Sequence, residues 1–378
     1  MNVRSALVLT IAALLVSPVA RSGHEQPVYP SYYPHEIEIA TIGPQRAGEL
    51  MRAGKLHAYV GGAPDFPSAR PDNIGTVASL SSFVIIRLNG ESTVAKDEGS
   101  ACAAASAIVR AMGAKGGELN VHPYPVTPFH GDYLNHADRA DAARQRLFAA
   151  PSLRDDLKIR TPSSLVRSLI RPDWLSEGTQ WDALVEEVSA SALVAESTVV
   201  LNGWLGPRWV RSGWYLAYRL LGGSVTELER KQEVDAVVDR LETAAYDGAV
   251  ERINLERKLV GLLSSGCRTM VAGYTLKREY FNADFSAGIE NLSFDALEGF
   301  ASPMFLRTVK LKDFPWNGWL QLGLGTRPVS AWNPVGGFTD EFGRLMWFAA
   351  GDAAAIPSPY DATWTLNRIS EVEASPIR

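Results

Sequence analysis

Between residues 36 and 60 the chain alternates between strand and helix patterns, with very short links that restrict how it can fold. Residues 36–42 place two isoleucines on one face, as in a half-buried strand. Pro44 can open a helix, and a second alternating run follows at residues 56–60. Because two strands joined through one helix are usually parallel, we expect a parallel βαβ unit here.

The alternation of strand and helix patterns continues to about residue 125. A third strand is expected over residues 83–88, a helix of small residues over 100–112, and a fourth strand over 118–121. We therefore predict that residues 23–130 form the α/β portion of the molecule.

Residues 131–300 show mostly helical spacing. A helix is expected over 132–148, and Thr179-x-x-Asp182 and Thr226-x-x-Glu229 resemble capping boxes that open two more. Another apolar face runs from Ile253 to Tyr274. Short links between these segments predict a large helical subdomain of antiparallel neighbours.

The last segment, residues 301–378, holds half of the ten tryptophans, with many glycines and prolines. Short strands are expected at 306–311, 319–324 and 344–349, separated by turn signals. The expected class is α/β, mixed α+β overall: an N-terminal parallel-sheet portion, a helical subdomain, and a Trp-rich β/loop segment that packs back.

The N-terminus has the pattern of a secretory signal peptide. Arg4 precedes the 11-residue apolar run Ala6–Val16, Pro18 breaks it, and Ala20-Arg21-Ser22 resembles a cleavage site. The run is too short to cross a bilayer of about 30 Å. Residues 1–22 therefore predict export, with the periplasm as the expected compartment.

Net charge and cysteine content further restrict which partners, disulfides and cofactors are expected. The formal net charge is −5, and removal of residues 1–22 would take away two arginines and no acid, which disfavours binding to nucleic acid. Cys102 and Cys267 could form one disulfide in an oxidising compartment, or remain two buried thiols. No C-x-x-C-H motif occurs, which excludes covalent c-type haem.

The phrase Leu50–Gly61 (LMRAGKLHAYVG) ends a predicted helix and leads into a strand that stops beside a glycine. With the strand before it, residues 36–62 resemble the opening of periplasmic solute-binding proteins of the phosphonate-receptor kind. The resemblance implies a ligand-binding α/β lobe. Such proteins have a second α/β lobe, whereas residues 150–275 here predict helices, so no ligand residue is carried over.

Three of the six histidines lie close together, at His122, His130 and His136, with Asp132 among them. Asp132 and His136 are four residues apart at a predicted helix start and share a face. Imidazole and carboxylate suit Zn, Cu or Fe, and the group could form a metal or acid–base site. We then expect at least two imidazoles to converge with Asp132. Alternatively, Asp132 caps a helix and the histidines are polar loop residues.

Aromatic and amide residues are paired in the C-terminal segment, at Trp316, Asn317, Trp319, Trp332 and Asn333. Flat rings beside hydrogen-bonding amides suit a pocket for a sugar-like or amphipathic ligand. The same rings could instead fill the seam between helices and sheet.

No nucleophile elbow, Walker loop or G-x-G-x-x-G motif occurs, so the sequence supplies no motif that names a reaction. The leading hypothesis is an exported ligand-binding or transport-accessory protein that holds a small organic ligand in an aromatic-lined cleft. The alternatives are a metal-dependent periplasmic enzyme that uses the His/Asp cluster, and a structural partner of a membrane complex.

Overall fold

The computed structural model describes residues 34–149, 156–195, 207–314, 318–328, 340–350, 354–359 and 361–366. Its centre is an eight-stranded mixed sheet in the order β1-β10-β2-β7-β3-β6-β5, with β4 paired to β7. Two further two-stranded ribbons are β8–β9 and β11–β12. The strands are β1 (Glu36–Thr41), β2 (Ala58–Val60), β3 (Ile74–Leu88), β4 (Asn120–Val121), β5 (Ile159–Arg160), β6 (Ala183–Ser189), β7 (Thr269–Asn282), β8 (Ile289–Glu290), β9 (Lys310–Leu311), β10 (Trp319–Leu324), β11 (Ala355–Pro357) and β12 (Trp364–Leu366).

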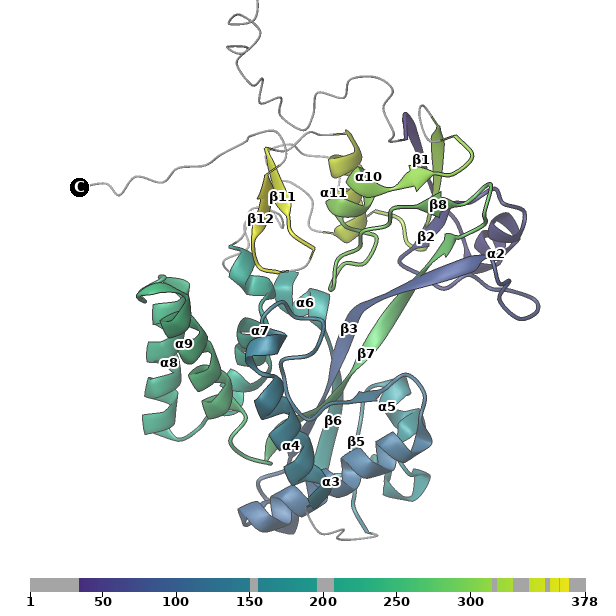
Figure 1. Cartoon of the computed structure of the whole chain (residues 1–378). Coiled ribbons are helices and arrows are strands. Elements are labelled where there is room, and N and C mark those ends of the chain that lie inside the picture. Colours follow the sequence, from purple (N-terminus) through teal and green to yellow (C-terminus); the bar gives the residue numbers. More distant parts are fainter. Residues whose placement is uncertain are drawn as a thin grey trace, which may run out of the picture.

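Helices cover both faces of this sheet (Figure 1). No helix in the described ranges is long and apolar enough to cross a membrane. The α-helices are α2 (Pro44–Arg52), α3 (Glu98–Lys115), α4 (Ala137–Ala149), α5 (Ser164–Leu169), α6 (Ala190–Ala195), α7 (Gly213–Leu221), α8 (Leu228–Glu242), α9 (Gly248–Leu263), α10 (Pro303–Thr308) and α11 (Glu341–Ala350).

The expected parallel βαβ unit is confirmed, with one addition. Strands β1 and β2 are both parallel to β10, which lies between them and comes from the C-terminal part of the chain. The two strands of the unit are therefore joined through β10 rather than paired directly.

The long strands β3 and β7 form the middle of the sheet and pair antiparallel along almost their whole length. Phe83 and Ile85 of β3 pack into the core formed with α7, α8 and α9. Val84 and Ile86 point to the opposite face and pack with α3 and α5. Both faces of β3 are thus buried, and Figure 1 shows α8 and α9 on one side of these strands and α5 on the other.

The helix expected from Thr179 is wrong. Residues 183–189 form β6, which pairs with β3, and within the described part of this segment, which stops at residue 195, the helix α6 begins only at residue 190. The Asp182 carboxylate accepts hydrogen bonds from the Ser92 hydroxyl and the Lys158 amide instead of capping a helix. The exposed backbone edge of β3 requires a partner strand, and that requirement outweighs the local helical spacing.

Other predicted boundaries also differ from the structure. The helix expected to continue to Tyr274 ends at Leu263, and Tyr274 lies on β7. The strand expected at 344–349 lies within α11, and residues 306–308 belong to α10, whose first turn is capped by Ser302. The strand expected at 319–324 is confirmed as β10.

Cys102 on α3 and Cys267, just before β7, are joined by a disulfide, with their Cα atoms 4.9 Å apart. The two residues are 165 positions apart, so the bond closes a long loop of the unfolded chain. It fastens α3 to the loop that leads into the central strand β7.

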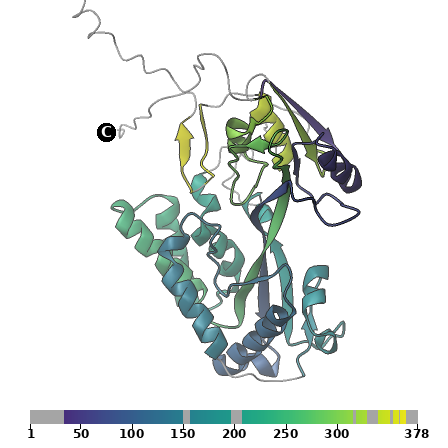
Figure 2. The same cartoon turned by 45° about the vertical axis from the view of Figure 1, so that its right-hand side comes forward.

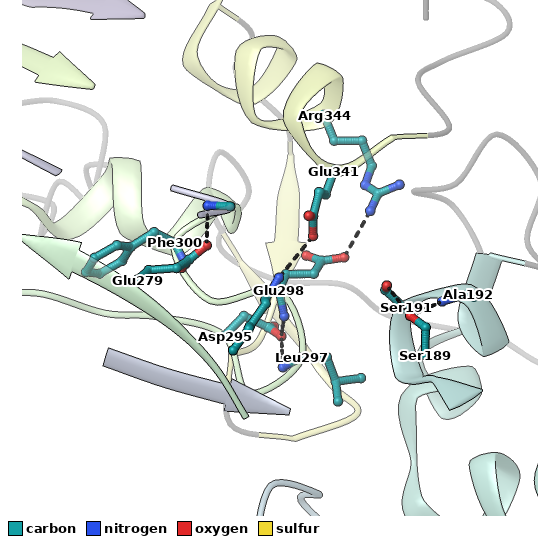
Figure 3. Close-up of polar contacts among 12 residues, drawn as sticks. Ser189, Ser191, Ala192, Glu279, Asp295, Leu297, Glu298, Phe300, Glu341 and Arg344 are labelled. Atoms are coloured by element: carbon teal, nitrogen blue, oxygen red, sulfur yellow. Dashed lines mark hydrogen bonds and ion pairs between the residues drawn. The ribbon is translucent and has the colours of Figure 1, made fainter. Parts of the chain in front are cut away.

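A cluster of buried charges connects β7 with the C-terminal helix α11 (Figure 3). The Glu279 carboxylate on β7 accepts hydrogen bonds from the amides of Gly61 and Phe300. Nearby, Lys277 pairs with Glu341 at 3.1 Å. Burial raises the pKa of Glu279 to about 7, although Lys277 and the two amides act in the opposite direction.

Replacing both Cys102 and Cys267 by serine should lower the free energy of unfolding by about 4–5 kcal/mol, from the entropy that the open loop regains. Urea unfolding of the oxidised wild type, the reduced wild type and the double variant measures this. Reduced wild type should match the variant, and a loss below about 1 kcal/mol in both would contradict the expectation.

Glu279→Gln should change how stability depends on pH. Between pH 4.5 and 7 the folded wild type keeps a proton on Glu279 that the unfolded chain has released, so this group's contribution to stability falls as pH rises. The free energy of unfolding of wild type relative to the variant should fall by about 2–3 kcal/mol across that window. Parallel pH curves from urea titrations would contradict this.

Candidate functional site

A cavity of about 630 Å³ lies between helices α7–α9 and the β11–β12 hairpin. In Figure 2 the hairpin, drawn in yellow, lies above the green helices. Residues 358–359 and 361–364 of the hairpin form one wall. The other walls carry aromatic side chains, namely Phe129, Trp209, Trp214 and Tyr246.

The tryptophans hold one another in place. Trp209, in the short 3₁₀ helix η4 (Arg208–Arg211), stacks on Trp214 of α7 with ring centres 5.6 Å apart. Its edge also meets the ring of Tyr215 at 5.0 Å. Trp214 is almost fully buried, whereas Trp209 is partly exposed and presents its ring to the cavity.

The polar part of the cavity wall includes four charged residues from the helical side, Asp132, Arg211, Arg252 and Glu256. Arg211 is almost fully buried and its guanidinium pairs with Asp295. Arg252 donates to one oxygen of Glu256 at 2.6 Å, one turn away on α9. Charged groups therefore meet the aromatic walls at one edge of the cavity.

Asp132 caps a helix, but not the one that follows it in sequence. Its carboxylate accepts from the amides of Gly213 (2.9 Å) and Trp214 (3.1 Å), the first residues of α7. A side chain at position 213 is excluded, since its Cβ would lie 2.4 Å from Cγ1 of Val126 and 2.9 Å from the Asp132 carboxylate. Glycine thus permits the close approach that this cap requires.

His136 follows the 3₁₀ helix η2 (Tyr133–Asn135) and is fully buried. Its Nδ1 is 3.0 Å from the Tyr124 hydroxyl, and its Nε2 has no hydrogen-bond partner. Burial lowers the pKa of His136 to about 4, and Arg257 and Arg139 act in the same direction against the opposing Asp132. The imidazole is therefore neutral at physiological pH.

Glu256 is also buried, with 1% of its surface exposed. One carboxylate oxygen accepts from Arg252, and the other, Oε2, has no partner. Burial raises the pKa of Glu256 to about 7; Arg252 acts in the opposite direction, and the nearby Asp132 charge adds to the rise.

These three residues converge. One ligand atom from each of Asp132, His136 and Glu256 lies within 4.8 Å of the others. Of the four residues that the sequence pattern singled out, the structure therefore brings together Asp132 and His136, and adds Glu256 from α9.

His130 and His122 lie outside this group of three. His130 is buried, accepts from the Thr127 amide at 2.9 Å through Nδ1, and stacks near Phe83. The Nε2 of His122 is 2.9 Å from the Val126 carbonyl, and its ring packs against Tyr274. Burial lowers the pKa of both histidines. Among the described residues, neither belongs to a three-membered group of ligand atoms within 4.8 Å.

The aromatic–amide residues predicted to bind ligand lie mostly outside the described residues. This applies to Trp316, Asn317, Trp332 and Asn333, and also to the expected signal peptide at residues 1–22. Trp319 is described: it begins β10 and is 63% exposed.

Sequence reasoning missed Glu256 and the role of Trp209. Arg252 and Glu256 have the spacing of an exposed ion pair on a helix. However, Glu256 is also three and four residues from Leu259 and Val260, both fully buried, which places it on the inner face of α9. A carboxylate on the apolar face of a predicted helix was therefore the feature of the sequence that could have drawn attention to Glu256.

The comparisons with known proteins give distant structural matches. No protein-family model and no curated protein matches the sequence. Similar solved structures include HbpA2 from Haemophilus parasuis (TM-score 0.41, 12% identity, covering 71% of this chain and 56% of that one). A nickel ABC transporter structure from Bacillus halodurans matches with a TM-score of 0.41 and 11% identity, covering 68% of this chain and 58% of that one. The oligopeptide-binding protein AppA from Bacillus subtilis matches with a TM-score of 0.37 and 12% identity, covering 71% of this chain and 59% of that one.

The chain thus spans a little over half the length of these structures. None of the three is described as a phosphonate receptor, so the resemblance of residues 36–62 to that family stays a prediction. The predicted mixed α/β class is confirmed by the structure itself.

Asp132→Asn should lower the free energy of unfolding by about 1–3 kcal/mol, because an amide cannot accept from both α7 amides and turns a donor toward one of them. Urea unfolding measures the loss. Asp97→Asn is the matched control: Asp97 caps its own helix α3 at an exposed site, where it accepts from the amide and the hydroxyl of Ser100, and asparagine is an equally good cap there. Equal losses in both variants would contradict the role given to Asp132.

Proposed function

We propose that this chain is an exported binding protein that holds a small organic ligand in the cavity beneath the β11–β12 hairpin. The observation that carries the proposal is the aromatic-walled cavity of about 630 Å³. Sites for small organic molecules typically have volumes of about 300–1,000 Å³, apolar walls and a few placed polar groups.

The walls indicate the kind of ligand. Trp209 presents a flat ring, held by Trp214 and Tyr215, that suits the face of a sugar or an aromatic ring. Arg252 is partly exposed at the cavity edge, and its guanidinium can donate to a carboxylate or hydroxyl oxygen. A ligand with a flat or apolar body and one oxygen-bearing group fits both features.

Export is supported by the signal-peptide pattern of residues 1–22, and the net negative charge supports a small-molecule partner over nucleic acid. An exported binding protein of this kind delivers its ligand to a membrane complex. We therefore extend the proposal to a transport-accessory role, with a membrane transporter as the partner.

A ligand that enters this cavity should raise the unfolding temperature of the wild type, and Trp209→Ala should abolish most of that rise because it removes the stacking surface. The measurement is a thermal-shift screen over sugars, amino acids, phosphonates and lipids. Trp319→Ala is the control, since Trp319 is exposed on β10 away from the cavity lining and its loss should leave the shift intact.

Two results would overturn the proposal. One is a ligand shift that survives Trp209→Ala but disappears in Trp316→Ala/Trp332→Ala, which would transfer binding to the C-terminal aromatic segment. The other is the absence of any stabilising compound among the four classes.

A further inference from the structure

We infer that Asp132, His136 and Glu256 form a binding site for one divalent transition-metal ion, with Zn²⁺ as the expected ion. The inference is independent of the organic ligand proposed above, because it rests on the three side chains and not on the aromatic walls.

The first observation is convergence from separate parts of the chain. Asp132 and His136 flank η2, whereas Glu256 comes from α9, yet their ligand atoms lie within 4.8 Å of one another. Bonds of about 2.0–2.2 Å to one ion require ligand atoms roughly 3–4 Å apart. Small side-chain rotations close that difference.

The second observation is a pair of buried polar atoms without partners. His136 is 0% exposed and Glu256 is 1% exposed, and neither Nε2 of the histidine nor Oε2 of the glutamate has a hydrogen bond. Buried polar atoms in native proteins are almost always bonded. A single ion between them supplies the missing partner to both.

The charges of the three side chains also favour a bound cation. Two carboxylates, Asp132 and Glu256, lie close together in a largely buried place. Arg252 bonds one oxygen of Glu256, and Arg257 is directed to Asp138 instead. A divalent cation between the two carboxylates offsets their repulsion and their desolvation.

The ligands are also held in place by neighbours. The Tyr124 hydroxyl lies 3.0 Å from Nδ1 of His136, so Nδ1–H can donate to it and leave the Nε2 lone pair for the ion. The first two amides of α7 fix the Asp132 carboxylate. Histidine ligands of metal sites are oriented by such hydrogen bonds to the second ring nitrogen.

The donor set selects the ion. One imidazole with two carboxylates suits a borderline ion such as Zn²⁺, whereas Mg²⁺ prefers oxygen ligands and retains several waters. Three protein ligands leave a coordination position open. Asp132 and Glu256 both line the cavity, so that position faces it.

The test is equilibrium dialysis and calorimetric titration of the metal-stripped protein with Zn²⁺, followed by Co²⁺, whose visible absorption reports its ligands. The wild type should bind one ion. Glu256→Gln and His136→Gln should each weaken binding about tenfold or more, and Tyr124→Phe, which only removes the orienting hydroxyl, should weaken it about tenfold.

Glu251→Gln and His130→Gln are the matched controls and should bind as the wild type does. Glu251 lies on the same helix as Glu256 and also pairs with an arginine, but its side chain is 37% exposed. Wild-type protein that takes up less than one equivalent of either ion, or Glu256→Gln and His136→Gln variants with wild-type affinity, would overturn the inference. A wild-type stoichiometry below one overturns the inference even if a variant does not fold, and the Co²⁺ absorption of the wild type must show both nitrogen and oxygen ligands. Neither result bears on the Trp209 test of the organic ligand.

Discussion

The antiparallel pairing of β3 with β7 is the interaction on which the rest of the molecule depends. Both strands run through the middle of the sheet, and successive residues of β3 serve two different cores. Residues Phe83 and Ile85 support α7–α9, and Val84 and Ile86 support α3 and α5. Since side chains alternate along a strand, a slip of one residue would exchange the two cores. The register of this pair therefore determines where the helices can lie.

The cavity and the buried carboxylates follow from that arrangement. The Pro-rich segment after β4 carries the chain across the face where α7–α9 pack, and Asp132 then meets the first amides of α7. Helix α9 presents Glu256 to the same place, while Arg257 on the adjacent side of the helix pairs with Asp138 of α4. A structural cap and two unpartnered polar atoms thus lie within one small volume. The ion site that we infer therefore shares Asp132 with the cap of α7.

The sequence predicted local structure where the local pattern and the tertiary environment agree. The βαβ unit at residues 36–60 and the strand at 319–324 are examples, because their apolar residues alternate and turn residues bound them. Residues 183–189 show the opposite case: their apolar spacing fits a helix, yet the unpaired edge of β3 makes them a strand. Of the group Asp132, His136 and Glu256, the first two were predictable as neighbours because they are four residues apart, although they flank the 3₁₀ helix η2 and do not share a face of one α-helix. Glu256 was not, because its proximity depends on how α9 packs more than a hundred residues later.

The position of β10 has a consequence for the order of events during folding. Among the strands that the structure describes, β2 has β10 and β7 as its neighbours, and β1 has β10 alone. The edge of the sheet that contains β1 therefore cannot form until residues 319–324 have joined it. Contacts of such long sequence separation form slowly, since a large loop must close first. We therefore expect the edge of the sheet that contains β1 to form after the long β3–β7 pair, because β1 and β10 are separated by even more of the chain than β3 and β7 are.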